Sequence, residues 1–431
     1  MTAVSESAGP GSTALSPFTP GEIALLYLPL FSVALGYGAM LPVLPGLLDR
    51  LHGASMDDAL PLHAGLLTGI YIGAFVVAAP FWGGVTDRRG PRGVLLAGLA
   101  GYAAATLWLG AAGSLAEAYA SRFVAGAFAA GLVPATAASI VARCDGVSRA
   151  RHLGWMSAAA IGGFLVGPAL TGWVHELLAA YPATGAVALH VTAVPIWATA
   201  AVAVVAALGI AWRFEPSHAP RALAATASTA ASLRERLGLL LLSAVGAFGL
   251  GAFEVGLSLQ SQRTWRLSPG DLGWLFVVCS LVMLAIQVLL FDRLRKRLQP
   301  AGLVVGGFLL MAAGFAFMPS TSAYGLILGL VALIAMGSGV LLPTLSVAIV
   351  DRAGPAAGSA AGYQNAAGNL GQAAGSAVVG LLFIAVPHGS FKVVSVAMTA
   401  TAIAAWILAR PHGLRSADGG PGVEHIGRPE Q

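Results

Sequence analysis

The segment GGVTDRRGPR, residues 83–92, is a short charged sequence between two long apolar runs. Because the flanking runs are long enough to cross a bilayer, the segment can only be a tight turn that joins two membrane-spanning helices. Its arginines predict a cytoplasmic position, since Lys and Arg are retained on that side of the membrane. We expect Asp87 to cap a neighbouring helix end, and Arg88 and Arg92 to hold carbonyl or carboxylate groups.

The composition excludes a water-soluble globule. Charged residues make up 10% of the 431 residues, hydrophobic residues make up 57%, and the mean hydropathy is +0.81. Soluble domains carry about 25% charged residues. Twelve apolar segments recur along the chain, and each has the roughly 20 residues that a spanning helix needs. We predict an all-α membrane protein with twelve transmembrane helices.

The placement of the basic residues predicts the topology. Most of them follow the even-numbered apolar segments, as Arg143, Arg213 and Arg352 do. The net charge of +5 is therefore read as a topology signal and not as a nucleic-acid surface. We predict a multi-pass protein of the cell (inner or plasma) membrane. Both termini are expected in the cytoplasm, with tails at residues 1–21 and 411–431.

Two short patterns occur twice in the chain. Pro134 is followed by Ile-Val-Ala-Arg ending at Arg143, and Pro343 is followed by Ile-Val-Asp-Arg ending at Arg352, a displacement of 209 positions (352 − 143). A weaker echo of Asp87-Arg88 occurs at Asp292-Arg293. Such repeats predict two pseudo-symmetric six-helix bundles related by an axis along the membrane normal. The expected bundles are 22–212 and 237–410, joined by a cytoplasmic linker at 213–236.

Three side chains in the apolar segments have polar groups that need a partner. Tyr37 opens a Gly/Pro-rich stretch, 37–45, that is expected to bend and to face the protein interior. Arg122 lies near the outer end of the segment 117–142, where it can extend to the membrane surface or pair inside the protein. Glu254 lies in the segment 237–259. Burial disfavours the charged form of a carboxyl group, so Glu254 either binds and releases protons or sits ionised near the outer surface.

The segment 358–386 carries a cluster of amides. Their spacing places three of them on one helix face, where they can line an aqueous cavity or hold helices together. A further amide in the segment 272–291 also needs an interior partner. The candidate cavity residues are Tyr37, Gln287, Gln364, Asn365, Asn369 and Gln372.

The segment 152–174 contains Gly163, Gly167, Pro168 and Gly172. Glycines four residues apart let two helix backbones approach closely, and the proline interrupts the hydrogen-bond ladder. This pattern predicts either a rigid packing seam or a flexing point.

The turn residues Gly83, Asp87, Arg88, Gly90 and Arg92 resemble the signature of the major facilitator superfamily. That signature lies between the second and third helices, and Pro91 departs from it where the family usually has a basic residue. The stretches 41–45, 122–126, 151–156 and 163–172 are similar to those of twelve-helix drug/proton antiporters, including tetracycline exporters. The resemblance implies that residues 83–92 form a conformational gate and that Arg122 takes part in proton handling.

These features predict a secondary transporter that works by alternating access and exports small amphipathic molecules in exchange for protons. The antiporters often carry a carboxylate in their first helix, and this chain has none there. A facilitator or proton symporter for a metabolite, such as a sugar or organic acid, is the alternative. An enzyme is not expected, because no His/Asp/Ser cluster stands out. We predict a monomer without metal or cofactor, whose partners are its substrate, protons and the bilayer.

Overall fold

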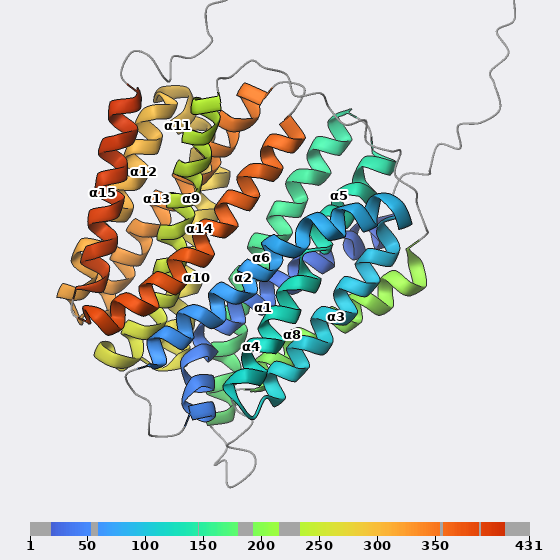
Figure 1. Ribbon diagram of the computed structural model, residues 1–431, viewed down its shortest axis with the longest axis horizontal. Helices are drawn as coiled ribbons and strands as arrows, with labels where there is room; N and C mark the ends of the chain where they lie inside the picture. Colours follow the sequence, from blue (N-terminus) through green and yellow to red (C-terminus); the bar gives the residue numbers. More distant parts are fainter. Residues whose placement is uncertain are drawn as a thin grey trace, which may run out of the picture. The chain divides into compact units, whose positions relative to one another are not determined.

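The computed structural model describes residues 19–52, 59–144, 146–179, 193–214, 233–353, 357–387 and 389–409, and these residues are organised as helices. Twelve of the helical spans in this part of the chain are long and apolar enough to cross a membrane, as the sequence predicted. The helices are α1 (Pro20–His52), α2 (Leu60–Arg89), α3 (Pro91–Ala111), α4 (Leu115–Ala129), α5 (Leu132–Arg143), α6 (Gly146–Ala179), α8 (Ala193–Arg213), α9 (Leu233–Gln260), α10 (Pro269–Ala285), α11 (Phe291–Arg297), α12 (Pro300–Phe317), α13 (Tyr324–Ala353), α14 (Ala357–Ala385) and α15 (Ser390–Ala409) (Figure 1).

The chain forms two compact units. Unit 1 comprises Met1–Ala225, Ala252–Ser280 and Ala373–Ala385, and unit 2 comprises Thr226–Gly251, Leu281–Gln372 and Val386–Gln431. The helices α9, α10 and α14 therefore each contribute to both units. The division into contiguous six-helix bundles at 22–212 and 237–410 stays a prediction.

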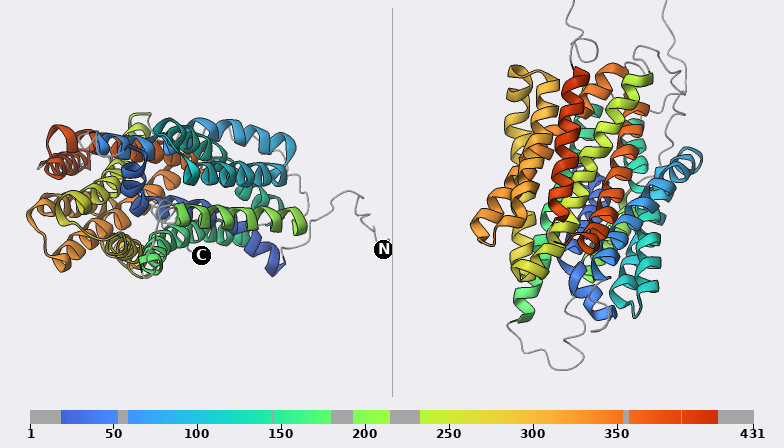
Figure 2. Two further views of the ribbon diagram at one scale, coloured as in Figure 1. Left: turned by 90° about the horizontal axis from the view of Figure 1, so that it is seen from below. Right: turned by 60° about the vertical axis from the view of Figure 1, so that its left-hand side comes forward.

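In unit 1, α1 packs against α6 and α8, while α4 packs against α2 and α3. In unit 2, α12 packs against both α13 and α15, and the views in Figure 2 also place them together. Glycines permit the closest of these contacts. A Cβ atom on Gly167 of α6 would lie 2.5 Å from both the amide nitrogen of Ala39 and the carbonyl oxygen of Leu35 in α1. The first and sixth helices can thus touch backbone to backbone.

Two predicted boundaries differ from the structure. The segment 117–142 forms two helices, because the turn residues Ala130 and Gly131 separate α4 from α5. Pro134 has no N–H for a hydrogen bond to the carbonyl group of Ala130, which explains the break. The predicted linker at 213–236 is also too long, since α9 already begins at Leu233.

Two of the predicted segments contain or continue into a π-helical turn, the first beyond the expected end at residue 259 and the second inside the expected segment 272–291. The residues Ser261–Trp265 extend α9, and the residues Ile286–Leu290 connect α10 to α11. Gln287 lies in the second of these turns. Wide turns of this kind are frequent at functional sites.

Candidate functional site

The Glu254 carboxyl group is buried in unit 1. Its side chain is 2% exposed, and the hydroxyl group of Tyr37 donates a hydrogen bond of 2.6 Å to its Oε2 atom. A second contact fixes the same pair of helices, since the Ser258 hydroxyl donates to the Leu41 carbonyl group at 3.1 Å. The expectation of an ionised, solvated Glu254 near the outer surface is therefore wrong. The alternative, in which Glu254 binds and releases protons, stays a prediction.

The aromatic ring of Tyr71 connects Tyr37 to Arg122. The Tyr37 ring stacks on that of Tyr71 with 5.9 Å between centroids, and the Arg122 guanidinium lies 4.1 Å from the Tyr71 centroid. Arg122 is 5% exposed, and its Nε atom donates to the carbonyl group of Leu67 at 3.3 Å. A cation over an aromatic face is stabilised by the ring quadrupole, the more so when it is desolvated. The extension of Arg122 to the membrane surface is thus wrong.

Gly126, one helical turn after Arg122, allows the close approach of α4 to α2 that places the Arg122 guanidinium over the Tyr71 ring. A Cβ atom on Gly126 would collide with the carbonyl oxygen of Tyr71, so only glycine lets α4 approach α2 this closely. Tyr71 and Phe164, whose ring lies 6.0 Å from that of Tyr37, were missed in the sequence. In the sequence, Tyr71 and Phe164 are aromatic residues inside apolar segments. Such residues are too common to be identified as part of a site.

The segment 83–92 is a tighter turn than we expected. The helix α2 continues to Arg89, Gly90 adopts φ 82°, and α3 starts at Pro91. Glycine suits that left-handed conformation, and proline suits the first position of a helix. The departure at Pro91 from the family signature therefore has a structural reason.

The charged side chains of this turn have different surroundings. Arg92 donates to the carbonyl group of Ala211 at the end of α8, at 2.7 Å, as the sequence predicted for this arginine. Asp87 and Arg88 are exposed, and neither makes a hydrogen bond or ion pair with the described residues. The expected helix cap by Asp87 is thus not found in this part of the chain. A Cβ atom on Gly83 would meet open space.

The glycine motif of α6 forms a packing seam. A Cβ atom on Gly163 would lie 3.0 Å from the amide nitrogen of Leu35 in α1. Beyond it, Gly172 lies against Gly270 of α10, and a Cβ atom on Gly273 would lie 2.7 Å from the carbonyl oxygen of Pro168. These contacts confirm the packing seam, whereas a flexing role stays a prediction.

Four of the amides predicted to line a cavity lie on α14 in unit 2, and Gln287 lies in the π-helical turn between α10 and α11. Asn369 donates to Asn365 at 3.2 Å, and Gln364 donates to the hydroxyl group of Ser346 in α13 at 2.8 Å. Gln372 and Gln287 are partly buried, and Asn365 is exposed. The Gln364 contact is the helix-to-helix hydrogen bond that we considered as the alternative. The cavity-lining role of this set stays a prediction.

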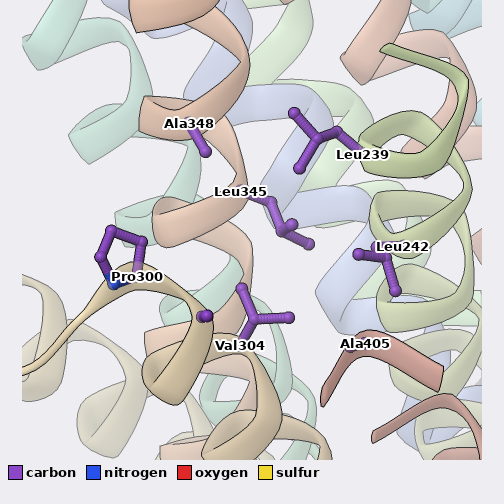
Figure 3. Close-up of a pocket in the computed structure, with 8 residues that line it drawn as sticks. Leu239, Leu242, Pro300, Val304, Leu345, Ala348 and Ala405 are labelled. Atoms are coloured by element: carbon purple, nitrogen blue, oxygen red, sulfur yellow. The ribbon is translucent and has the colours of Figure 1, made fainter. Parts of the chain in front are cut away.

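A small apolar hollow lies between α9, α12, α13 and α15 in unit 2 (Figure 3). Pro300 and Val304 of α12 face Leu345 and Ala348 of α13 across it, and Leu239 of α9 closes one side. Its volume is about 20 Å³, whereas sites for small molecules enclose about 300–1,000 Å³. This hollow is therefore too small to be a substrate site.

Each unit holds an equivalent ion pair between helix ends. Arg143 at the end of α5 contacts Glu22 at the start of α1 at 2.9 Å, and Arg352 at the end of α13 contacts Glu235 at the start of α9 at 2.7 Å. The arginines are 209 positions apart (352 − 143), and the glutamates are 213 apart (235 − 22). The repeat detected in the sequence therefore marks the same kind of contact in both units.

We expect the Arg143→Gln substitution to destabilise the protein by about 1–3 kcal/mol, because it removes the charged partner of a partly buried carboxylate that keeps its hydrogen bonds from Thr19. The side chains of Arg143 and Glu22 are 2% and 13% exposed. The matched control is Arg295→Gln, since Arg295 and its partner Asp351 are 48% and 61% exposed. Thermal unfolding of the purified variants should show a lower midpoint for Arg143→Gln alone. Equal midpoints for Arg143→Gln and Arg295→Gln would contradict a stabilising role of the Arg143–Glu22 ion pair.

The family model described as Major Facilitator Superfamily matches residues 26–376 and 239–425. The chain belongs to the Major Facilitator Superfamily. The protein is therefore a membrane transporter and not an enzyme.

Its relatives include multidrug and drug-resistance proteins. "Multidrug resistance protein 2" of Bacillus subtilis (strain 168) is 27% identical to this chain over 367 residues, which cover 82% of this chain and 86% of that protein. "Quinolone resistance protein NorA" of Staphylococcus aureus is 23% identical over 366 residues, which cover 84% and 90% of the two chains.

Solved structures show the same fold. The human organic anion transporter MFSD10 (TETRAN) aligns with a TM-score of 0.60 at 22% identity, over 90% of this chain and 100% of that one. A bacterial homolog of the human lysosomal transporter Spinster aligns with a TM-score of 0.71 at 14% identity, over 90% and 96% of the two chains. At these identities the likeness concerns the fold alone.

Proposed function

We propose that this transporter exports small amphipathic molecules, including drugs, in exchange for protons. The observation that carries the proposal is the buried carboxyl group of Glu254, which receives a hydrogen bond from Tyr37. A carboxyl group inside a membrane segment is costly to keep charged, and such groups mark proton and ion pathways. The names of two relatives refer to multidrug and quinolone resistance, which supports export as the direction of transport and drugs as a substrate class.

In the proposed cycle, Glu254 takes up a proton on one side of the membrane and releases it on the other. The protonated form is neutral and tolerates burial, whereas the carboxylate is stabilised by the donated hydrogen bond from Tyr37. Arg122 supplies a fixed positive charge next to the Tyr71 ring. We propose that the transporter is a monomer in the cell membrane with both termini in the cytoplasm. Its two halves would expose the substrate to one side at a time.

The proton gradient is large enough to drive this export. Moving one elementary charge through 100 mV supplies about 2.3 kcal/mol. That free energy sustains a substrate gradient of roughly fifty-fold, because 1.36 kcal/mol corresponds to a factor of ten. Two kinds of substrate fit the proposal, namely a quinolone and a neutral amphipathic dye.

The proposal is tested in everted membrane vesicles that contain the protein. Energised vesicles should accumulate the quinolone or the dye, and an uncoupler that collapses the proton gradient should release it. Addition of substrate should also dissipate a preformed pH gradient. Accumulation that persists with the uncoupler would reject proton coupling, and substrate flow that only follows its own gradient would favour a facilitator.

We expect the Tyr37→Phe substitution to slow proton-driven transport by about tenfold or more. The substitution removes a hydrogen bond to a charged group, which contributes about 1.5–3 kcal/mol, but it keeps the ring that stacks on Tyr71. Tyr119→Phe is the matched control, since the Tyr119 hydroxyl group is hydrogen-bonded to His63 at 2.8 Å and not to Glu254. Initial rates in everted vesicles give the comparison, and equal losses in both variants would contradict a role of the Tyr37 hydroxyl in coupling.

A further inference from the structure

The junction between α11 and α12 carries an excess of exposed positive charge. Four of the seven residues of α11 are cations, and none of the seven is buried. Arg293 donates to the carbonyl group of Leu289 in the preceding π-helical turn at 2.7 Å, and Arg295 contacts Asp351 at 3.3 Å. Lys296 and Arg297 are exposed and make no ion pair with the described residues. With Asp292 as the acidic residue of α11, this helix end keeps a net positive charge.

The beginning of α12 adds backbone donors at the same place. This helix of 18 residues starts at Pro300, and no side chain caps its N-terminal N–H groups. The Gly302 position is open, because a Cβ atom built there would have no atom within 4 Å. Unpaired N–H groups and the positive end of the helix dipole both favour an anionic group, phosphate above all.

Apolar side chains border these donors on two sides. Val288, Leu289, Leu290 and Leu298 flank α11 and are 42–69% exposed. In a chain that spans the membrane, exposed leucine and valine side chains face the hydrocarbon. The first turn of α12 also borders the apolar hollow of Figure 3 through Pro300 and Val304. An occupant of this junction must therefore present an anionic group and apolar chains together.

We propose that the α11–α12 junction binds the headgroup of an anionic phospholipid, with Lys296 and Arg297 contacting the phosphate. Arginine and lysine form charge-assisted hydrogen bonds to phosphate oxygens. A lipid also covers the exposed leucines, which a free phosphate ion cannot do. Basic residues directly beside a transmembrane helix are attracted to anionic lipids, and each contributes to the binding. The site does not depend on proton coupling or on the substrate.

Binding of short-chain phosphatidylglycerol to the purified full-length protein tests the proposal. Native mass spectrometry compares it with phosphatidylcholine of the same chain length. We expect Lys296→Gln/Arg297→Gln to weaken phosphatidylglycerol binding by about fivefold for each charge removed and about thirtyfold in total. The matched control, Arg266→Gln/Lys392→Gln, removes two exposed cations at other helix ends and should bind as the unmodified protein does.

A second pair of variants tests the α12 N-terminus. Gly302→Glu places a negative charge in the open position and should abolish phosphatidylglycerol binding, whereas Gly302→Ser should leave it unchanged. Equal binding by the two double variants would overturn the proposal. Equal binding of phosphatidylcholine and phosphatidylglycerol would overturn it as well. Displacement of the lipid by an equal concentration of inorganic phosphate would show a simple anion site and would also contradict it.

Discussion

Replacing Glu254 by glutamine is expected to abolish proton-driven accumulation of substrate in everted vesicles. The amide has the shape of the protonated acid and can still accept the hydrogen bond from Tyr37, but it cannot bind or release a proton. Substrate exchange without a gradient should therefore continue while accumulation stops. This combination separates a loss of coupling from a loss of the folded protein.

The control for this prediction is Glu176→Gln. Glu176 is an exposed residue of α6, so its substitution removes one carboxylate without touching the contacts of Tyr37. Vesicles with the Glu176→Gln variant should accumulate substrate at the same rate as vesicles with the unmodified protein. If Glu254→Gln still accumulated substrate, the coupling proton would have to bind elsewhere, and Glu254 would have to be removed from the mechanism.

The second large effect is expected on stability, from Gly163→Ala and Gly167→Ala. At both positions the new methyl group would meet backbone atoms of α1, which cannot rotate away as the end of a side chain can. Overpacking of this kind costs about 1–3 kcal/mol at each site. We expect low expression of the double variant and a reduced thermal midpoint for each single variant.

Gly162 offers a matched control in the adjacent position. A Cβ atom on Gly162 would lie 4.0 Å from the ring of Phe31, which is ordinary van der Waals contact. Alanine is also the better helix former, so Gly162→Ala should be neutral or slightly stabilising. If the variants at 162 and 163 had the same midpoint, the contact between α1 and α6 would not be the close packing described above.

Much of the fold could be predicted from local composition. A segment of about 20 apolar residues must cross the bilayer as a helix, because its backbone groups have no other hydrogen-bond partners there. The sequence therefore predicted the twelve spans and the turn at residues 83–92. The break between α4 and α5 was missed, although Pro134 was visible, since proline inside a membrane helix causes either a kink or an interruption.

The candidate site was only partly predictable. Glu254 and Arg122 stood out because a charged residue in an apolar segment is rare. The side chains that surround Glu254 and Arg122 could not be predicted from the sequence. The hydroxyl group of Tyr37 reaches Glu254 across 217 positions of the chain, and that of Ser258 reaches across the same separation to Leu41. Both contacts depend on how α9 packs against α1.

The sequence by itself determined that the chain spans a membrane with twelve helices, where its tight turn lies, and which glycines and charges are unusual. Length and hydropathy are sufficient for this, because each helix satisfies its own backbone hydrogen bonds. Only the tertiary structure decided that Glu254 is buried with Tyr37, that Arg122 lies over Tyr71, and that Arg143 pairs with Glu22. These outcomes depend on side chains from distant helices, whose approach is set by packing that no local pattern contains.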